Sequence, residues 1–299
     1  MSASYWESTQ RQKWQYTRES LFRERHQLWL MECQLFPQGL TVTMENNKAD
    51  GEAVTRNIPI THVDLHYGKD YNLRIYCYFL IMKLGRRLNI RQYALATAHV
   101  YLARFLLCAS VREVNLYLLV TTCIYLACKV EECPQHIRAL VNEARSLWPE
   151  FVPPDPTKVT EFEFYLLEEL QSYLIVHHPY RSMEQIVSAL RSEPYGLVLS
   201  ATDLQNCWSL INDSYITDLH LLVPPHVIAM ASMLIIVSLQ RSQRPSLQET
   251  FNSFMAQSQV DLAEVMDTIQ DLITMYDYWD KYNEPWVKFL LHSLYLRST

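Results

Sequence analysis

Residues 114–132, VNLYLLVTTCIYLACKVEE, constrain the fold more than any other stretch of the chain. The first fifteen residues carry no charged side chain, and charge then returns abruptly at Lys129, Glu131 and Glu132. The run is too long for an ordinary strand and shorter than the ~20 apolar residues that span a bilayer. It therefore predicts a helix buried on nearly all sides at the centre of an all-α domain. The charge cluster at its end indicates a surface kept for a partner.

The bulk composition limits the class of protein. At 299 residues with 49% hydrophobic content, the chain can form one large domain or two of ordinary size. Five glycines against 13 prolines favour helices over turn-rich sheet. The net charge of −6 argues against direct binding to a phosphate backbone. The seven cysteines lack CxxC spacing and the N-terminus lacks an apolar signal segment, so we expect a soluble intracellular protein with reduced thiols.

Hydrophobic periodicity predicts a duplicated helical architecture. We expect an N-terminal helix over 5–36, capped by Ser8 or Thr9, and then a polar loop over 46–52. The heptad positions of this helix are Trp14, Leu21, Leu28 and Leu35. Further helices are predicted at 70–87, 91–108, 114–132, after Pro134, 157–170, 182–191, 203–217, 225–240, 246–257, 261–279 and 285–295. The predicted domains are residues 1–60 (N-terminal helix and polar loop), 61–176 and 177–299.

The two predicted bundles differ at one point. Aligning residues 120–129 with 230–239 superimposes the two apolar helices, and Lys129 then meets Leu239. Any partner surface at the charged end therefore belongs to the first repeat alone.

Signatures of catalysis and metal binding are absent from the sequence. There is no GxGxxG, phosphate-binding loop, HExxH, CxxC or GxSxG pattern, so we expect no catalytic residue, no metal and no cofactor. His177 and His178 are adjacent in a predicted linker and point opposite ways, which favours packing over a shared ion. A basic cluster, Lys83, Arg86, Arg87 and Arg91, surrounds a predicted helix end. It either complements the helix dipole or forms a patch for an acidic partner.

Several local strings resemble the cyclin box. An apolar helix ending LACKVEE, a following helix with FEFYLLEEL and the duplicated five-helix unit carry this likeness. Tyr5-Trp6 with Ser8, KVEEC at 129–133, LIVHHPYR at 174–181 and NDSYITDLHLLVPPHVIA at 212–229 resemble the cyclin C family in its fungal form, the cyclins of the Mediator kinase module. The resemblance implies two tandem cyclin boxes of five helices each, preceded by an additional N-terminal helix.

The resemblance also implies a function. Such a cyclin is a non-catalytic subunit that binds a cyclin-dependent kinase beside its αC helix and holds that helix in the active position. Lys129 and Glu163 match the contact pair of the family, and Leu167 is a candidate apolar contact. Glu132, with Glu131 as the second choice, is a candidate to supply negative charge to an activation loop that carries no phosphate.

The remaining expectations concern other partners. Trp6 is a candidate contact for another protein. Tyr76 lies where cell-cycle cyclins carry a substrate-docking motif, although Leu80 stands in place of its tryptophan, so the patch is either a partner contact or core. The implied partners are the kinase and other subunits of the Mediator kinase module, in a nuclear heteromeric complex without direct nucleic-acid or membrane contact. Alternative hypotheses are another transcriptional cyclin, a two-repeat cyclin-fold general transcription factor and a helical scaffold.

Overall fold

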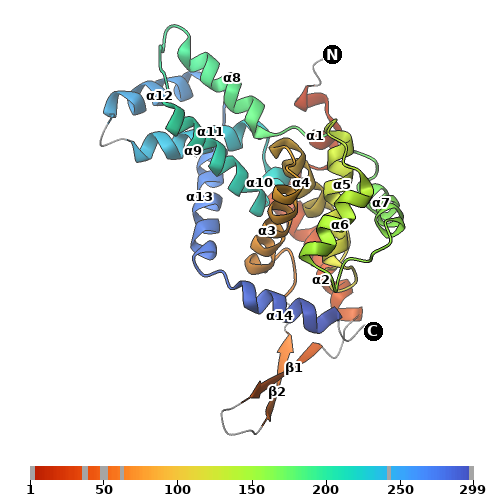
Figure 1. The fold of residues 1–299 in the computed structure, drawn as a ribbon. Helices are drawn as coiled ribbons and strands as arrows, with labels where there is room; N and C mark the ends of the chain where they lie inside the picture. Colours follow the sequence, from red (N-terminus) through yellow and green to blue (C-terminus); the bar gives the residue numbers. More distant parts are fainter. Residues whose placement is uncertain (1–3, 36–39, 48–52, 61–63, 241–243, 296–299) are drawn as a thin grey trace. The chain divides into compact units, whose positions relative to one another are not determined.

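The computed structural model describes residues 4–35, 40–47, 53–60, 64–240 and 244–295, and helices dominate them (Figure 1). The α-helices are α1 (Thr9–Lys13), α2 (Arg18–Leu35), α3 (Tyr71–Arg87), α4 (Gln92–Cys108), α5 (Leu116–Val130), α6 (Ile137–Leu147), α7 (Thr157–Glu169), α8 (Pro179–Arg191), α9 (Ala201–Asp213), α10 (Leu219–Leu222), α11 (Pro225–Leu239), α12 (Pro245–Gln257), α13 (Leu262–Trp279) and α14 (Glu284–Tyr295). Short 3-10 helices cover Tyr5–Glu7 and Ser214–Ile216. The predicted all-α class is confirmed.

Two compact units divide the chain. The first-repeat unit comprises Glu19–Ser172 with Tyr278–Thr299, and the second-repeat unit comprises Met1–Arg18 with Tyr173–Asp277. Each unit therefore combines two stretches that are distant in sequence. The division falls close to the predicted boundary at 176/177, but it assigns the first 18 residues to the second repeat and the C-terminal segment to the first.

Helix α5 is the centre of the first-repeat unit. It packs against α3, α4, α6 and α7, and eleven of its fifteen residues are buried. The Asn115 side chain accepts hydrogen bonds from the backbone N–H groups of Tyr117 and Leu118, so the helix begins with a side-chain cap. The predicted central buried helix is confirmed, and its only strongly charged part is its C-terminal end.

Helix α11 has the same position in the second-repeat unit. It packs against α8, α9 and α12, and it is also fifteen residues long with eleven of them buried. Pro225 occupies its first turn, where a missing N–H costs nothing. The duplication inferred from the apolar pattern is confirmed at the level of architecture.

The N-terminal region departs from the predicted single helix. Ser8 caps α1 as expected, because its Oγ accepts a hydrogen bond from the Arg11 N–H. The chain then leaves helical geometry before α2, since the backbone N–H of Tyr16 donates to Leu221 O at 2.7 Å. This tertiary bond to the end of α10 replaces the helical one. Leu35, the last predicted heptad position, is 49% exposed.

A β-hairpin follows α2, which the sequence analysis did not predict. Strands β1 (Leu40–Asn47) and β2 (Ala53–Ile60) pair antiparallel, with Leu40 opposite Ile60. The alternation in LTVTM was a strand signal that the glycine-poor composition hid. Of the predicted polar loop at 46–52, residues 48–52 lie outside the described residues.

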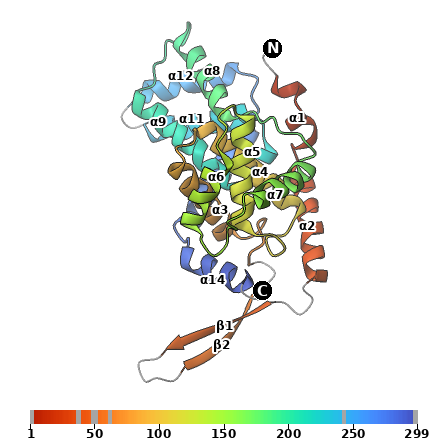
Figure 2. The ribbon, with the colours of Figure 1, turned by 45° about the vertical axis from the view of Figure 1, so that its right-hand side comes forward.

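Helix α14 completes the first-repeat unit, although the sequence predicted it within residues 177–299. It lies against α3 (Figures 1 and 2). The hydroxyl of Tyr295 accepts a hydrogen bond from the Leu116 N–H at 2.9 Å and donates to Val114 O at 3.2 Å. The C-terminal helix therefore helps to satisfy the polar groups where α5 begins. Over the described ranges, the chain has no helix that is long and apolar enough to cross a membrane.

Candidate functional site

Lys129 and Glu163 meet at the charged end of α5. The Lys129 Nζ donates to both carboxylate oxygens of Glu163, at 2.7 and 2.9 Å. Lys129 lies in the last turn of α5 and Glu163 lies at the middle of α7, which packs directly on α5. Two helices of the first-repeat unit thus hold the ion pair.

The pair retains hydrogen-bonding capacity for another molecule. The Lys129 side chain is 42% exposed, and its Nζ lies 4.4 Å from the centroid of the Tyr125 ring. Partial burial favours the neutral amine, but the hydrogen bond and charge of Glu163 outweigh it, so the pKa of Lys129 is raised. A carboxylate has about four acceptor sites, and Lys129 occupies two of those of Glu163. The Lys129 side chain reaches the surface, whereas the Glu163 side chain is only 11% exposed, so a partner would meet the pair at its lysine end.

Phe164 extends the site along α7. It is 73% exposed, next to Glu163 and one turn before half-buried Leu167. Residues at i, i+3 and i+4 share a helix face, so Glu163, Phe164 and Leu167 form one contiguous strip that also includes Thr160. Tyr165 is 63% exposed but lies about 200° around the helix from Glu163. The sequence analysis missed Phe164, although the string FEFYLLE places this phenylalanine directly after Glu163, a residue of the predicted charge pair.

Glu131 and Glu132 occupy different environments at the end of α5. The half-buried carboxylate of Glu131 accepts a 2.6 Å hydrogen bond from Thr97 Oγ1 of α4, and burial raises the pKa of Glu131. Glu132 is exposed and adopts φ = 55°, in the left-handed region that glycine usually occupies. The Cys133 N–H donates to Cys128 O at 2.9 Å across this turn. Glu131 is thus tied to its own domain, whereas Glu132 projects from a sharp turn.

The other two predicted contacts differ in accessibility. Trp6 is 59% exposed, with its ring 5.7 Å from that of His226 in the second-repeat unit. Tyr76 is only 1% exposed, and its hydroxyl is 2.8 Å from that of Tyr117. Of the two interpretations left open for Tyr76, the structure places it in the core. The hypothesis that Tyr76 contacts a partner is corrected accordingly, because its hydroxyl is used inside the bundle.

His177 and His178 have structural contacts. His178 is buried, and its Nδ1 lies 2.6 Å from the hydroxyl of Tyr215. The backbone N–H of His177 donates to the Gln10 side chain. In the part of the chain that the structure describes, no group of three or more His, Cys, Asp and Glu side chains could hold a metal ion.

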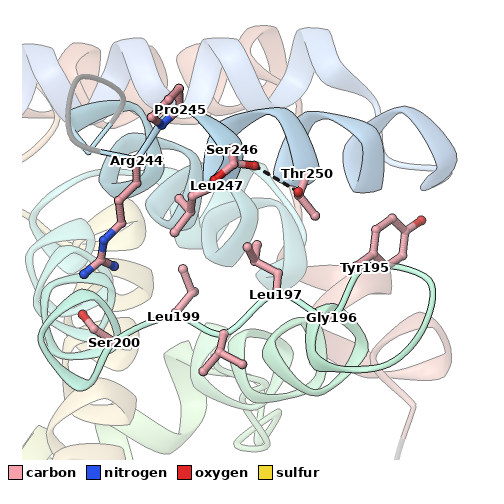
Figure 3. A pocket seen from close by; sticks show the side chains of 11 residues that line it. Tyr195, Gly196, Leu197, Leu199, Ser200, Arg244, Pro245, Ser246, Leu247 and Thr250 are labelled. Carbon is pink, nitrogen blue, oxygen red and sulfur yellow. Dashed lines mark hydrogen bonds between the residues drawn. The ribbon is translucent and has the colours of Figure 1, made fainter.

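A cleft of about 670 Å³ lies in the second-repeat unit, between residues 195–200 and the start of α12 (Figure 3). Its lining combines apolar residues such as Leu197 and Leu247 with polar residues such as Ser200, Ser246 and Thr250. Arg244 is the one charged residue of this lining, and its guanidinium lies 3.3 Å from buried Asp203. The lining contains no pairing of a nucleophile with a base.

Comparison with known proteins identifies the family. The RNA polymerase II holoenzyme cyclin-like subunit of Eremothecium gossypii is 78% identical over 99% of this chain and 90% of its own length. Residues 51–175 match the cyclin N-terminal domain, and residues 178–277 match the cyclin C-terminal domain. This chain belongs to the cyclin family. The protein of the same name from Saccharomyces cerevisiae is 66% identical over 99% of this cyclin and 98% of the relative, which confirms the resemblance to fungal cyclin C proteins.

Solved structures agree on the fold of this cyclin. A chain of the yeast TFIIK complex has a TM-score of 0.63 at 20% identity, with 91% of this chain and 99% of that chain covered. A chain of the CAK complex from Chaetomium thermophilum bound to ATP-γ-S has a TM-score of 0.65 at 17% identity, with coverages of 92% and 79%. At these identities the likeness extends to the fold alone.

Proposed function

We propose that this cyclin binds and activates the cyclin-dependent kinase of the Mediator kinase module and so regulates transcription by RNA polymerase II. The observation that carries the proposal is the Lys129–Glu163 ion pair, which is held beside exposed Phe164 at the end of the central helix. The relatives share the name of RNA polymerase II holoenzyme subunit, which supports the transcriptional assignment and a nuclear location. The protein itself acts as a regulatory subunit without catalysis of its own.

The proposed contact has two chemically distinct parts. The remaining acceptor sites of the Glu163 carboxylate bind free backbone N–H groups at one end of the kinase αC helix, and Lys129 holds that carboxylate in place. Phe164 and Leu167 insert against the apolar side of the same helix. Burying one aromatic side chain contributes about 2 kcal/mol, whereas the exposed charges mainly set orientation.

Activation follows from the position of the bound helix. A kinase needs its own β3 lysine paired with a glutamate of αC before ATP is correctly placed. A cyclin that binds only the inward position of αC shifts the equilibrium toward that state by its difference in affinity. Glu132, projecting beside the same contact, is proposed to supply a carboxylate to the basic cluster of an unphosphorylated activation loop. Glu131 is the weaker candidate because Thr97 already engages it.

Trp6 is proposed as a contact for another subunit of the kinase module. Its exposed ring belongs to the second-repeat unit, whereas the proposed kinase-binding helices α5 and α7 belong to the first-repeat unit. Tryptophan is among the residues that most often dominate binding energy at interfaces.

The decisive experiment exchanges the two charges. A tagged Lys129→Glu/Glu163→Lys double variant keeps an internal ion pair but reverses the charge pattern offered to the kinase. We expect co-purified kinase to fall at least ~30-fold, about 2 kcal/mol, because each αC backbone group then meets the wrong charge. Mass spectrometry identifies and quantifies the bound kinase, and phosphorylation of a peptide reports its activity.

A matched control is available on the same helix. Lys158 and Glu161 form an exposed ion pair at 2.8 Å, so Lys158→Glu/Glu161→Lys is the equivalent exchange away from the site. Kinase recovered undiminished with the first exchange would contradict the proposed contact. If the wild-type cyclin bound the kinase but left it inactive, the cyclin would be a scaffold that does not activate the kinase. A general transcription factor that binds promoter DNA would retain no kinase even as the wild type, and the acidic net charge of this chain disfavours it.

A further inference from the structure

The outer face of α3 carries a basic stripe. Lys83, Arg86 and Arg87 belong to α3, Arg91 immediately precedes α4, and Lys288 belongs to α14; all are in the first-repeat unit. Lys83, Arg86 and Arg87 recur at the three- and four-residue spacing that places side chains on one helix face. Arg86, Arg87 and Arg91 are exposed. We use the name α3 basic stripe for these five residues.

The end of α3 is already capped without these side chains. The carbonyls of Leu84 and Gly85 accept hydrogen bonds from the backbone N–H groups of Leu88 and Ile90, at 3.1 and 2.9 Å. The carbonyl of Arg86 accepts one from Asn89, which adopts φ = 49° in the turn. This is the backbone pattern that closes a helix by itself. Complementing the helix end therefore does not account for three arginines at this corner.

The carboxylates near the stripe do not neutralise it. Lys83 and Lys288 share one carboxylate, that of Glu284, at 3.0 and 2.7 Å, and their hydrogen bonds lower the pKa of Glu284. Arg87 lies 3.8 Å from Glu143 of α6. Counted over these seven side chains, five cations face two carboxylates, in a chain whose net charge is −6. Across the described residues, Arg86 and Arg91 form no ion pair.

The corner that presents the arginines is rigidly packed. A Cβ on Gly85 would lie 2.4 Å from the Leu95 side chain, so α3 and α4 approach closely at the residue before Arg86. The four residues between the helices, 88–91, are held by the hydrogen bonds described above. The arginines therefore project from fixed backbone positions, and binding an anion there would cost little backbone ordering.

We propose that the α3 basic stripe docks a phosphorylated serine or threonine segment of a partner protein. Guanidinium groups bind phosphate oxygens through paired, parallel hydrogen bonds, and clusters of arginine are a recurring means of recognising phosphopeptides. A phosphoserine carries up to two negative charges and three acceptor oxygens, which match two unpaired guanidinium groups. Nucleic acid would require a longer positive track on a less acidic protein.

Fluorescence anisotropy of the purified full-length chain tests this surface without any kinase. The probe is a fluorescein-labelled twelve-residue peptide with two phosphoserines, compared with the same peptide carrying serine or glutamate at those positions. We expect the phosphorylated peptide to bind at least ten-fold more tightly than either. An Arg86→Glu/Arg91→Glu variant should lose at least ten-fold in affinity for it. Circular dichroism confirms that the variant is folded.

Arg191 supplies the control, because it is an exposed arginine in the last turn of α8 in the other unit. Arg191→Glu should leave binding unchanged. Equal binding of the serine and phosphoserine peptides, or unchanged binding by the double variant, overturns the proposal. Equal binding of the glutamate peptide would mean a general acidic surface, and displacement by an equally charged DNA oligonucleotide at lower concentration would mean a nucleic-acid surface. Either result also overturns it. The variant should still co-purify with the kinase, so failure here is separable from failure of the kinase proposal.

Discussion

The two central helices, α5 and α11, occupy equivalent buried positions in their bundles but carry different side chains at their C-terminal ends. Both are fifteen residues long, both lie at the centre of a helical bundle and both have eleven buried residues. Helix α5 ends with Lys129 paired to Glu163 and with Glu132 projecting from the turn. Helix α11 ends with Leu239, which is 73% exposed, followed by Gln240.

This contrast separates what the fold requires from what binding requires. Because α11 supports its bundle with an uncharged end, a buried central helix does not need an ion pair at its exit. The charges at the end of α5 are therefore not required for packing and can bind a partner. The second repeat, which has the same central helix without these charges, is an internal control for that surface.

The largest expected effect comes from giving α5 the ending of α11. Lys129→Leu removes the ammonium from the pair and leaves the Glu163 carboxylate, which is 11% exposed, without its cation. We expect kinase binding to fall at least ~30-fold, measured by quantitative co-purification, because removing one partner of a desolvated interfacial charge pair costs about 2–5 kcal/mol. The reciprocal variant Leu239→Lys should bind kinase as the wild type does. Equal losses in both variants would contradict the asymmetry between the repeats.

The second prediction concerns the apolar strip on α7. Phe164→Ala should weaken kinase binding by about 2 kcal/mol, roughly 30-fold, because an aromatic anchor is lost from the interface. Its thermal unfolding midpoint should hardly change, since the side chain is 73% exposed in the free cyclin. Tyr165→Ala is the matched control, because Tyr165 is similarly exposed but lies about 200° around α7 from Glu163. A larger loss of kinase binding from Tyr165→Ala than from Phe164→Ala would contradict the proposal that the kinase contacts the face of α7 that carries Phe164.

The sequence predicted the elements that depend on local periodicity and missed those that depend on tertiary contacts. Long apolar helices such as α5 and α11 were visible because every turn repeats the same pattern. The break before α2 could not be predicted in this way. It depends on the backbone hydrogen bond from Tyr16 to Leu221, two residues that are distant in sequence. The membership of α14 in the first-repeat unit was hidden for the same reason, as Tyr295 finds its partners at Val114 and Leu116.

The candidate site was predicted in part. The meeting of Lys129 with Glu163 was inferred from family resemblance, and the distance between them bears out their proximity. Burial was harder to infer, since Tyr76 and Phe164 are both aromatic residues on amphipathic helices. Which of them is covered depends on the angle at which neighbouring helices pack, and a single sequence does not contain that angle.

The third prediction separates strain from function at the end of α5. Glu132→Gly removes the cost of a left-handed conformation, about 1 kcal/mol, while greater freedom of the unfolded chain offsets part of this gain. The unfolding midpoint should therefore stay level or rise slightly, but stimulation of kinase activity should fall if Glu132 contacts the activation loop. Gln171→Gly is the control, because Gln171 follows α7 with φ = 51° and has no proposed contact. Unchanged stimulation by the Glu132 variant, at equal kinase binding, would remove Glu132 from the mechanism.

The smallest effect concerns the beginnings of the two central helices. Asn115 caps α5 and also donates to Phe151 O at 2.6 Å, whereas α11 begins with Pro225 and no side-chain cap. Asn115→Ala should lower the free energy of unfolding by about 1 kcal/mol, measured by urea denaturation, because two backbone N–H groups lose their acceptor. Since the cap lies at the opposite end of α5 from Lys129, kinase affinity per folded molecule should be preserved. A loss of affinity without a loss of stability would show that α5 transmits changes from one end to the other, and the partner surface would then depend on the whole helix rather than on its exit alone.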